Sequence, residues 1–294
     1  MKKGVVIFNP TAGISVKKDL KSEVKSQLEK VGIAVDFLIL DANFEKLAAN
    51  YDWSKIEIVI AWGGDGTVKV AARTIIEFNL KVPLGIIPFG SANVLAATLK
   101  IPVNLSEAIK LIGANKTIKI DVGRINNSKY FLVGFSVGYI SSIIINTEKE
   151  LKNKFGFWGY AIRLFLNRIR INKIKFKIET PHKTFWVRGN SLIIFNAFNF
   201  YGFRTKKDIS ITDGILNLYV VTNKTFISMI EVAFNILFYN QPTKNIFTLD
   251  SNKFTITLKH RRQLKTCQID GDYIKLVNKE IIIDVLPQAL SVIC

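Results

Sequence analysis

Residues 58–68 read Ile-Val-Ile-Ala-Trp-Gly-Gly-Asp-Gly-Thr-Val, and this stretch indicates the class of fold. A short apolar run of strand length ends in Gly63-Gly64-Asp65-Gly66-Thr67, and a helix-like segment follows directly. Glycine lets a ligand approach the backbone closely, and the first N–H groups of a helix attract phosphate. A tight turn with Asp65 as helix cap explains an isolated Gly-Gly-Asp-Gly equally well, so the motif alone leaves both interpretations open.

Two further stretches repeat this design, each with a short apolar strand that ends in a small polar loop. The loop after residues 5–8 reads Asn9-Pro10-Thr11-Ala12-Gly13, and the loop after residues 84–87 reads Pro88-Phe89-Gly90-Ser91-Ala92-Asn93. In an open parallel sheet such loops gather along the carboxyl edge, where ligands bind. The three loops together favour a ligand site over three unrelated turns.

The motifs Asn-Pro-x-x-Gly, Gly-Gly-Asp-Gly-Thr and Pro-x-Gly-Ser-x-Asn in these loops resemble the nucleotide site of the diacylglycerol kinase-like lipid kinases. The resemblance continues in order through Asp121-Val122-Gly123, Gly134 with Gly138, Asp213-Gly214 and Asp270-Gly271-Asp272. It implies ATP and Mg²⁺ as cofactors. The nucleotide contacts that it implies are Asn9, Pro10, Thr11, Ala12, Gly13, Gly63, Gly64, Asp65, Gly66, Thr67, Ser91 and Asn93.

The resemblance also implies an acidic turn close to the acceptor hydroxyl. Phosphoryl transfer requires positioning, charge neutralisation and a base for the hydroxyl proton. Asp272 is the candidate base, Asp270 is its alternate or a partner of Mg²⁺, and Asp65 shapes the phosphate loop. The family has Asp-Gly-Glu where this chain has an aspartate at 272, which is shorter by one methylene. Asp-Gly is also a favoured hairpin pair, so a plain turn is the other interpretation of this stretch.

A structural Mg²⁺ site is implied at Asp213, held by its carboxylate and by nearby backbone carbonyls, for which Ser210 and Ile215 are the candidates. As sequence alone, this stretch is a turn between strands. Two departures from the family pattern occur at Lys69 and Val94, where the family often has an asparagine-glutamate and an asparagine-aspartate pair. The second departure weakens a network that would join Asp65, position 94 and Asp121, and we interpret it as the mark of a subgroup.

The net charge of +18 is typical of a protein that binds nucleic acid, of one that binds an anionic membrane surface, or of a lysine-rich proteome. The sequence has no helix-turn-helix, zinc-finger or RNA-binding signature, which argues against nucleic acid. Residues 149–170 contain lysines, Trp158 and an apolar stripe, which suits either an anionic membrane interface or a cover for a β-domain. We expect a cytoplasmic protein that associates peripherally with the inner face of the membrane and does not bind nucleic acid. A homodimer is left open. Two cysteines and two histidines argue against a disulfide framework and a zinc cluster.

The order of the elements predicts an α/β N-terminal domain with a parallel sheet over residues 1–120 and a C-terminal β-sandwich domain over 121–294, the two sharing a cleft. The sandwich itself agrees with the resemblance. We expect strands at 5–8, 33–40, 56–61, 84–87, 117–125, 130–139, 174–179, 184–188, 192–198, 215–221, 254–259, 264–269 and 280–285, and helices at 16–31, 44–49, after Gly66, at 91–99 and at 105–112. The uncharged stretch 130–147 fits two strands joined by glycines better than a membrane span.

The function predicted from these features is ATP-dependent phosphorylation of a lipid hydroxyl, on diacylglycerol or a related lipid such as a sphingoid base. NAD kinases share Gly-Gly-Asp-Gly and are the rival enzymes. A non-catalytic regulator that binds a lipid or a nucleotide is the alternative from another class of protein.

Overall fold

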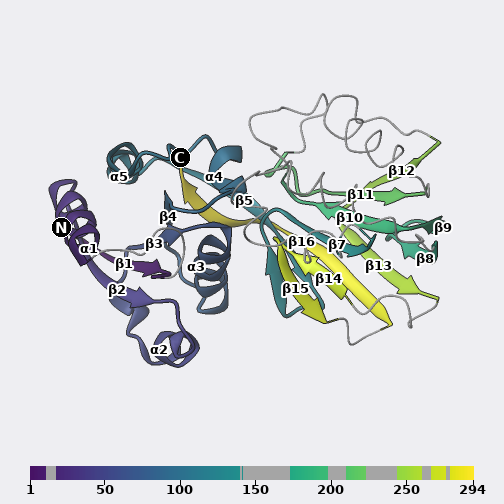
Figure 1. Ribbon diagram of the computed structural model, residues 1–294, viewed down its shortest axis with the longest axis horizontal. Coiled ribbons are helices and arrows are strands. Elements are labelled where there is room, and N and C mark those ends of the chain that lie inside the picture. Colours follow the sequence, from purple (N-terminus) through teal and green to yellow (C-terminus); the bar gives the residue numbers. More distant parts are fainter. Residues whose placement is uncertain are drawn as a thin grey trace. The chain divides into compact units, whose positions relative to one another are not determined.

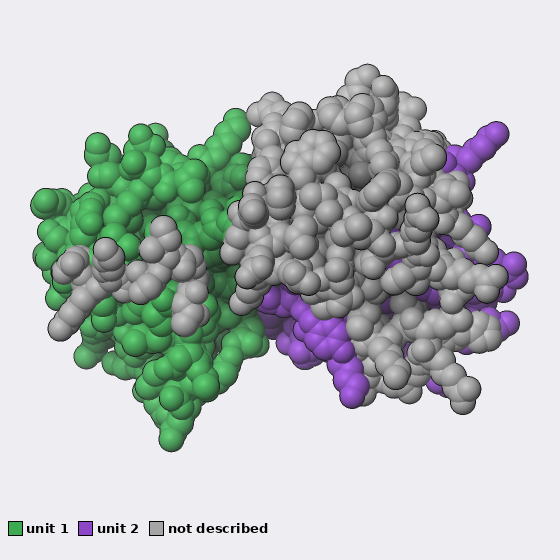
Figure 2. All heavy atoms as spheres, viewed as in Figure 1, with its two compact units in different colours: residues 1–120, 288–294 green, residues 121–287 purple. Residues whose placement is uncertain are grey.

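The computed structural model describes residues 1–10, 18–139, 141, 173–197, 210–222, 244–259, 266–275 and 279–294. The chain forms two compact units, which are coloured separately in Figure 2. Unit 1 comprises Met1–Ile120 with Gln288–Cys294, and unit 2 comprises Asp121–Pro287. The C-terminal seven residues, assigned to the second domain in the sequence analysis, therefore belong with unit 1 in the structure.

Unit 1 is built on a parallel sheet of buried apolar strands. Its strands are β1 (Lys2–Phe8), β2 (Ile33–Ile39), β3 (Ile58–Gly63) and β4 (Leu84–Pro88), and the end of β16 (Glu280–Ile293) joins them. They pair in the order β2-β1-β3-β4, and Val292 of β16 lies opposite Leu84 in a parallel register. Strands β3 and β4 are buried along their whole length, as expected for a parallel sheet that is covered on both faces.

Helices cover this sheet (Figure 1). They are α1 (Lys18–Lys30), α2 (Phe44–Asn50), α3 (Asp65–Glu77), α4 (Val94–Thr98) and α5 (Leu105–Ala114), with a 3₁₀ turn η1 (Trp53–Lys55). Helices α1 and α5 place Val24, Leu28, Ile109 and Ile112 in one core cluster with alternate side chains of β1 and β3. Helix α3 packs on β3 and β4 and buries Ala71 and Ile75.

Unit 2 contains two antiparallel layers. One layer runs β12-β11-β10-β7-β14-β15, and the other runs β16-β13-β8-β9 with β5 and β6 beside β16. The strands are β5 (Thr117–Ile125), β6 (Lys129–Phe131), β7 (Gly134–Gly138), β8 (Ile174–Glu179), β9 (Thr184–Gly189), β10 (Ser191–Phe195), β11 (Leu216–Val221), β12 (Ile246–Ser251), β13 (Lys253–Leu258), β14 (Thr266–Ile269) and β15 (Asp272–Lys275). One core cluster joins side chains of both layers, among them Phe135, Leu192, Phe176 and Phe254. The predicted fold class, an α/β domain followed by a β-sandwich, is confirmed.

Several predicted elements have different bounds in the structure. Residues 130–139 form two strands instead of one, because the N–H groups of Leu132 and Val133 bond to the side chain of Asp270 rather than to a neighbouring strand. The helix predicted at 91–99 begins only at Val94, since Asn93 has a left-handed backbone with φ of 47°. Strands β12 and β15 were not predicted, and β16 continues past Pro287 to Ile293.

None of the helices in the described ranges combines the length and the apolar character needed to cross a membrane.

Candidate active site

The turn between β3 and α3 depends on close packing that only glycine permits. A Cβ atom on Gly63 would lie 2.3 Å from Oγ1 of Thr67, a side chain that is itself buried. Gly64 caps α3, and its carbonyl accepts the N–H groups of Thr67 and Val68 at 2.9 and 3.1 Å. The helix thus starts directly at Asp65, with its first N–H groups at the end of the strand, the arrangement that binds anions in many proteins.

The turn after β4 packs directly against this first turn. A Cβ on Gly90 would lie 2.5 Å from the Cα of Gly64 and 2.8 Å from Oδ1 of Asn93, and the N–H of Phe89 donates to the carbonyl of Gly63 at 2.8 Å. Two glycine backbones therefore touch where two parallel strands end. This contact explains why both motifs contain glycine, and it joins the two predicted phosphate loops into one structure.

The side chain of Asn93 stabilises the second turn by a hydrogen bond to the backbone of that turn. Its Nδ2 donates to the carbonyl of Gly90 at 2.7 Å, and no donor in the described part of the chain reaches its buried Oδ1. Ser91, on the same turn, is exposed. The turn thus presents an acceptor oxygen that no donor of the described residues reaches, next to an exposed serine.

The predicted loop after β1 is described only in part. Asn9 and Pro10 follow directly on β1, whose Phe8 lies opposite Trp62 in the parallel register with β3. The carboxyl ends of β1, β3 and β4 therefore share one edge of the sheet, as the sequence predicts. Thr11, Ala12 and Gly13 lie outside the described residues.

In unit 2, the carboxylate of Asp270 holds residues 132–134 in place through hydrogen bonds. Its Oδ2 accepts the N–H of Leu132, and its Oδ1 accepts the N–H groups of Val133 and Gly134, each at 2.9 Å. Its own N–H donates to the carbonyl of Gly134 at 3.0 Å. A carboxylate that already accepts three N–H groups is poorly placed to take a further proton, so this geometry favours a structural role for Asp270.

Asp272 has a different environment. It is the first residue of β15, opposite Ile269 across a tight turn that Asp270 and Gly271 form with positive φ angles of 49° and 90°. The residue is exposed. Of the two predicted carboxylates of this turn, Asp272 is the one that solvent and a ligand can reach, while Asp270 holds the turn in place.

Asn196 was not among the residues predicted from the sequence, and its hydrogen bonds connect the end of β10 to β5 and to the loop between β6 and β7. It follows β10, is fully buried, and donates through Nδ2 to the carbonyls of Asp121 and Leu132, both at 2.9 Å. Its own N–H donates to the carbonyl of Val133 at 2.9 Å. Asn196 therefore binds the carbonyl groups of the short loop between β6 and β7, and Asp270 binds the N–H groups of the same loop. An asparagine directly after an apolar strand is the only sequence signal, and it is common.

The predicted metal site lies beside a second acidic group. Burial raises the pKa of the Asp213 carboxyl, the N–H of Ile215 counteracts this, and the negative charges of Asp121 and Asp250 raise it further. The fully buried Asp121 accepts the N–H of Gly214 at 2.6 Å. Asp213 itself accepts the N–H of Ile215 at 3.0 Å, and the hydroxyl of Ser210 lies 3.1 Å from that of Thr212. In the described part of the chain, no three acidic, histidine or cysteine side chains converge to hold a metal ion. A Mg²⁺ site at Asp213 stays a prediction.

The basic helix predicted within residues 149–170 lies outside the described residues.

Comparisons with known proteins fit this arrangement of motifs. The family model described as "Diacylglycerol kinase catalytic domain" matches residues 3–125. The chain is 30% identical over 239 residues to "Probable lipid kinase YegS-like" of Klebsiella pneumoniae (strain 342). This alignment covers 80% of this chain and 77% of that protein. It is 29% identical over 227 residues to "Diacylglycerol kinase" of Staphylococcus epidermidis (strain ATCC 12228 / FDA PCI 1200), with 75% and 70% covered. The fold resembles a crystal structure of a diacylglycerol kinase from Bacillus anthracis str. Sterne, with a TM-score of 0.73, 20% identity and 99% and 96% of the two chains covered.

These matches define the class of protein as lipid kinase. The chain belongs to the diacylglycerol kinase-like family of lipid kinases, and the resemblance inferred from its motifs is confirmed.

Proposed function

We propose that this protein transfers the γ-phosphoryl group of ATP to the hydroxyl of a membrane lipid, diacylglycerol or a related lipid such as a sphingoid base. The observation that carries the proposal is the contact between Gly64 and Gly90 at the carboxyl ends of β3 and β4. Two glycine turns packed on each other, with the first N–H groups of α3 beside them, suit the phosphate chain of a nucleotide.

The residues of unit 1 fit a nucleotide with Mg²⁺. Asp65 offers a carboxylate in the first turn of α3, and the buried Oδ1 of Asn93 has no donor in the described part of the chain. Asn9 and Ser91 stand on the two flanking loops. When bound, Mg²⁺ supplies charge neutralisation on the phosphates. The protein's own residues hold the phosphate chain through backbone N–H groups and set its direction.

In unit 2, Asp272 is the proposed general base, which takes the proton from the lipid hydroxyl as the phosphorus–oxygen bond forms. Its exposure supports this role, whereas the three N–H groups on Asp270 support an anchoring role for that residue. Asp270 and Asn196 would then fix the base in position. The lipid substrate would be taken from an anionic membrane on the cytoplasmic face, which agrees with the net charge of +18.

A kinase assay with radiolabelled ATP tests this proposal against its rivals. Diacylglycerol, a sphingoid base and NAD are offered in parallel. We expect label on a lipid and none on NAD. Label on NAD would replace the proposal by an NAD kinase, and binding of nucleotide or lipid without transfer of label would leave a non-catalytic regulator.

The control for this assay is Asp65→Asn. We expect the variant to lose turnover while its cooperative melting transition persists, because a half-buried carboxylate at a helix start contributes little to the core. Loss of the melting transition instead would show that Asp65 serves the turn and not the phosphates.

A further inference from the structure

One face of unit 2 combines an exposed tryptophan with a cluster of cations. Strands β8 and β9 alternate strictly: Phe176, Ile178 and Val187 point into the core, so the residues between them point outward. In the described sheet β9 is the last strand of its layer. We call its outer surface the Trp186 face, and it comprises Lys175, Lys177, Trp186, Arg188 and Lys259.

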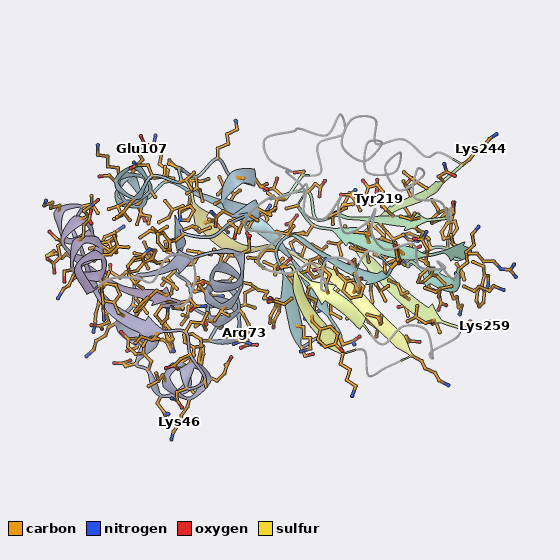
Figure 3. All side chains as sticks on the ribbon, viewed as in Figure 1. Lys46, Arg73, Glu107, Tyr219, Lys244 and Lys259 are labelled. Atoms are coloured by element: carbon orange, nitrogen blue, oxygen red, sulfur yellow. The ribbon has the colours of Figure 1, made fainter. Side chains whose placement is uncertain are left out.

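The cations on this face lie side by side. Lys175 is directly opposite Arg188 in the antiparallel register, and the N–H of Lys259 donates to the carbonyl of Lys175 from the other side at 3.3 Å. Figure 3 shows Lys259 just beyond the end of β13. Like charges opposite one another on a sheet are destabilising. Lys177 pairs with Glu179 at 2.8 Å, but no carboxylate of the described residues lies within ion-pair distance of the other three.

Trp186 gives this cluster an apolar centre. The side chain is 54% exposed, and Nζ of Lys175 lies 4.4 Å from the centre of its ring. Tryptophan favours the boundary between lipid headgroups and acyl chains, where its ring is buried and neighbouring lysines meet phosphate. Single-stranded nucleic acids are bound by several aromatic rings on which successive bases stack, and among its described residues this face has one exposed ring, that of Trp186.

We propose that the Trp186 face is a docking surface for an anionic lipid membrane. Its cations Lys175, Arg188 and Lys259 complement the negative lipid headgroups, and the Trp186 ring inserts among these headgroups. The binding free energy released by neutralising Lys175 and Arg188 offsets the repulsion that this pair causes in the free protein. The proposal rests on the proposed function only in assuming that the lipid substrate resides in a membrane, and it uses none of the site residues.

The test is partitioning onto vesicles of phosphatidylcholine with and without phosphatidylglycerol. The variant Lys175→Gln/Lys259→Gln is compared with Lys46→Gln/Lys110→Gln, whose lysines are exposed on α2 and α5 of unit 1. Both pairs lower the net charge of +18 by two, so a difference between them reports position and not total charge. We expect the first pair to weaken partitioning on the order of 30-fold and the second to have little effect, given the contribution of each basic residue near an anionic surface. Equal partitioning of the two pairs would overturn the proposal.

Trp186→Phe supplies an optical readout. The protein has four tryptophans, of which Trp53 and Trp62 are buried. In a Trp158→Phe background, which removes the tryptophan of the stretch 149–170, anionic vesicles should shift the emission to shorter wavelength and quench it when the lipids are brominated, and adding Trp186→Phe should remove most of both effects. If instead the Lys175→Gln/Lys259→Gln pair loses binding to single-stranded DNA while it keeps binding to vesicles, the face is a nucleic-acid surface and the proposal is wrong.

Kinase activity on lipid in neutral detergent micelles separates this proposal from the proposed function. The face variants should turn over micellar lipid at the wild-type rate, since no site residue is changed. If the wild type phosphorylates no lipid at all, the proposed function fails and the vesicle result still decides the docking surface. A loss of micellar activity in the face variants would assign these lysines to catalysis and contradict a separate docking role.

Discussion

At the scale of single residues, the two carboxylates of the acidic turn at 270–272 have different environments. Asp270 accepts three backbone N–H groups from residues 132–134, while Asp272, two positions on, is exposed. Hydrogen bonds to an ionised carboxylate are stronger than those between neutral groups, so the first aspartate contributes mainly to structure. The second is exposed and is the proposed base.

The two aspartates should therefore respond differently to substitution. Asp272→Asn removes the base and should lower kcat by roughly 10²–10⁴-fold, with the KM for ATP nearly unchanged and normal thermal stability. Asp272→Glu should retain activity, because it restores the family's residue. Steady-state kinetics and thermal melts measure both effects.

Asp270→Asn completes this comparison. It replaces one accepting oxygen by an NH₂ group that faces backbone donors, so it should lower the melting temperature as well as kcat. If both asparagine variants phosphorylate lipid at the wild-type rate, the stretch is a plain hairpin turn and the catalytic assignment fails.

Asn196 is predicted to be a positioning residue for the same turn. Asn196→Ala removes the hydrogen bonds that Nδ2 donates to the carbonyls of Asp121 and Leu132, which costs about 0.5–1.5 kcal/mol for each bond. We expect kcat to fall with little change in the KM for ATP, and amide exchange at residues 132–134 to accelerate.

The matched control is Asn217→Ala. Asn217 is also a buried asparagine of unit 2, and its Nδ2 donates to Asp250 at 2.9 Å; it lies opposite Phe195 but makes no hydrogen bond to residues 132–134 or 270–272 in the described part of the chain. It should lose similar stability and keep its kcat. Equal loss of kcat in the two variants would mean that Asn196 acts only through global stability.

At the scale of elements, two of the three predicted nucleotide loops pack on each other. The turn after β3 and the turn after β4 touch through Gly64 and Gly90, so neither can move without the other. This contact needs a parallel sheet in which β3 and β4 are neighbours, with Gly63 opposite Pro88. Loop geometry is thus a property of the pair of strands and not of either motif alone.

Gly90→Ala tests this coupling. The added Cβ would lie 2.5 Å from the Cα of Gly64 and must push the two turns apart. We expect weaker ATP binding, measured by titration calorimetry, together with a loss of stability. Gly85→Ala is the control, because its added Cβ would lie 3.1 Å from the side chain of Ile112 near the start of β4, so it should lower stability and leave ATP affinity unchanged. Equal ATP affinity in Gly90→Ala and the wild type would contradict a nucleotide site at this contact.

At the scale of the whole molecule, the chain passes between the two units twice, within β5 and within β16. The first part of β16 pairs with β13 in unit 2, and its last residues pair with β4 in unit 1. Leu290, Val292 and Ile293 are almost completely buried there. The core of unit 1 therefore depends on residues that follow unit 2 in the chain.

Leu290→Ala should destabilise unit 1 by about 2–5 kcal/mol, the usual cost of removing a fully buried leucine side chain. Chemical denaturation followed by near-ultraviolet circular dichroism measures the change. Ala289→Ser, at an exposed position next to it, should have almost no effect. An unchanged midpoint in Leu290→Ala would show that the end of β16 contributes nothing to unit 1.

The sequence by itself determined the family, the fold class and the positions of the three nucleotide loops, because local patterns specify each of these features. Apolar runs set the strands, glycines mark the turns, and the strand–loop–helix rhythm requires a parallel sheet. The candidate role of Asp272 came from the family resemblance, and the helix predicted after Gly66 begins earlier than expected, at Asp65.

Only the tertiary structure decided which residues hold these pieces together. The role of Asp270 depends on N–H groups more than 130 residues away, the contact between Gly64 and Gly90 depends on strand order, and Asn196 depends on both layers of unit 2. The division of residues 130–139 into β6 and β7 and the extension of β16 to Ile293 also depend on tertiary contacts. A hydrogen bond to a distant backbone group produces no periodic pattern of residues in the sequence, because its two partners come together only when the core packs.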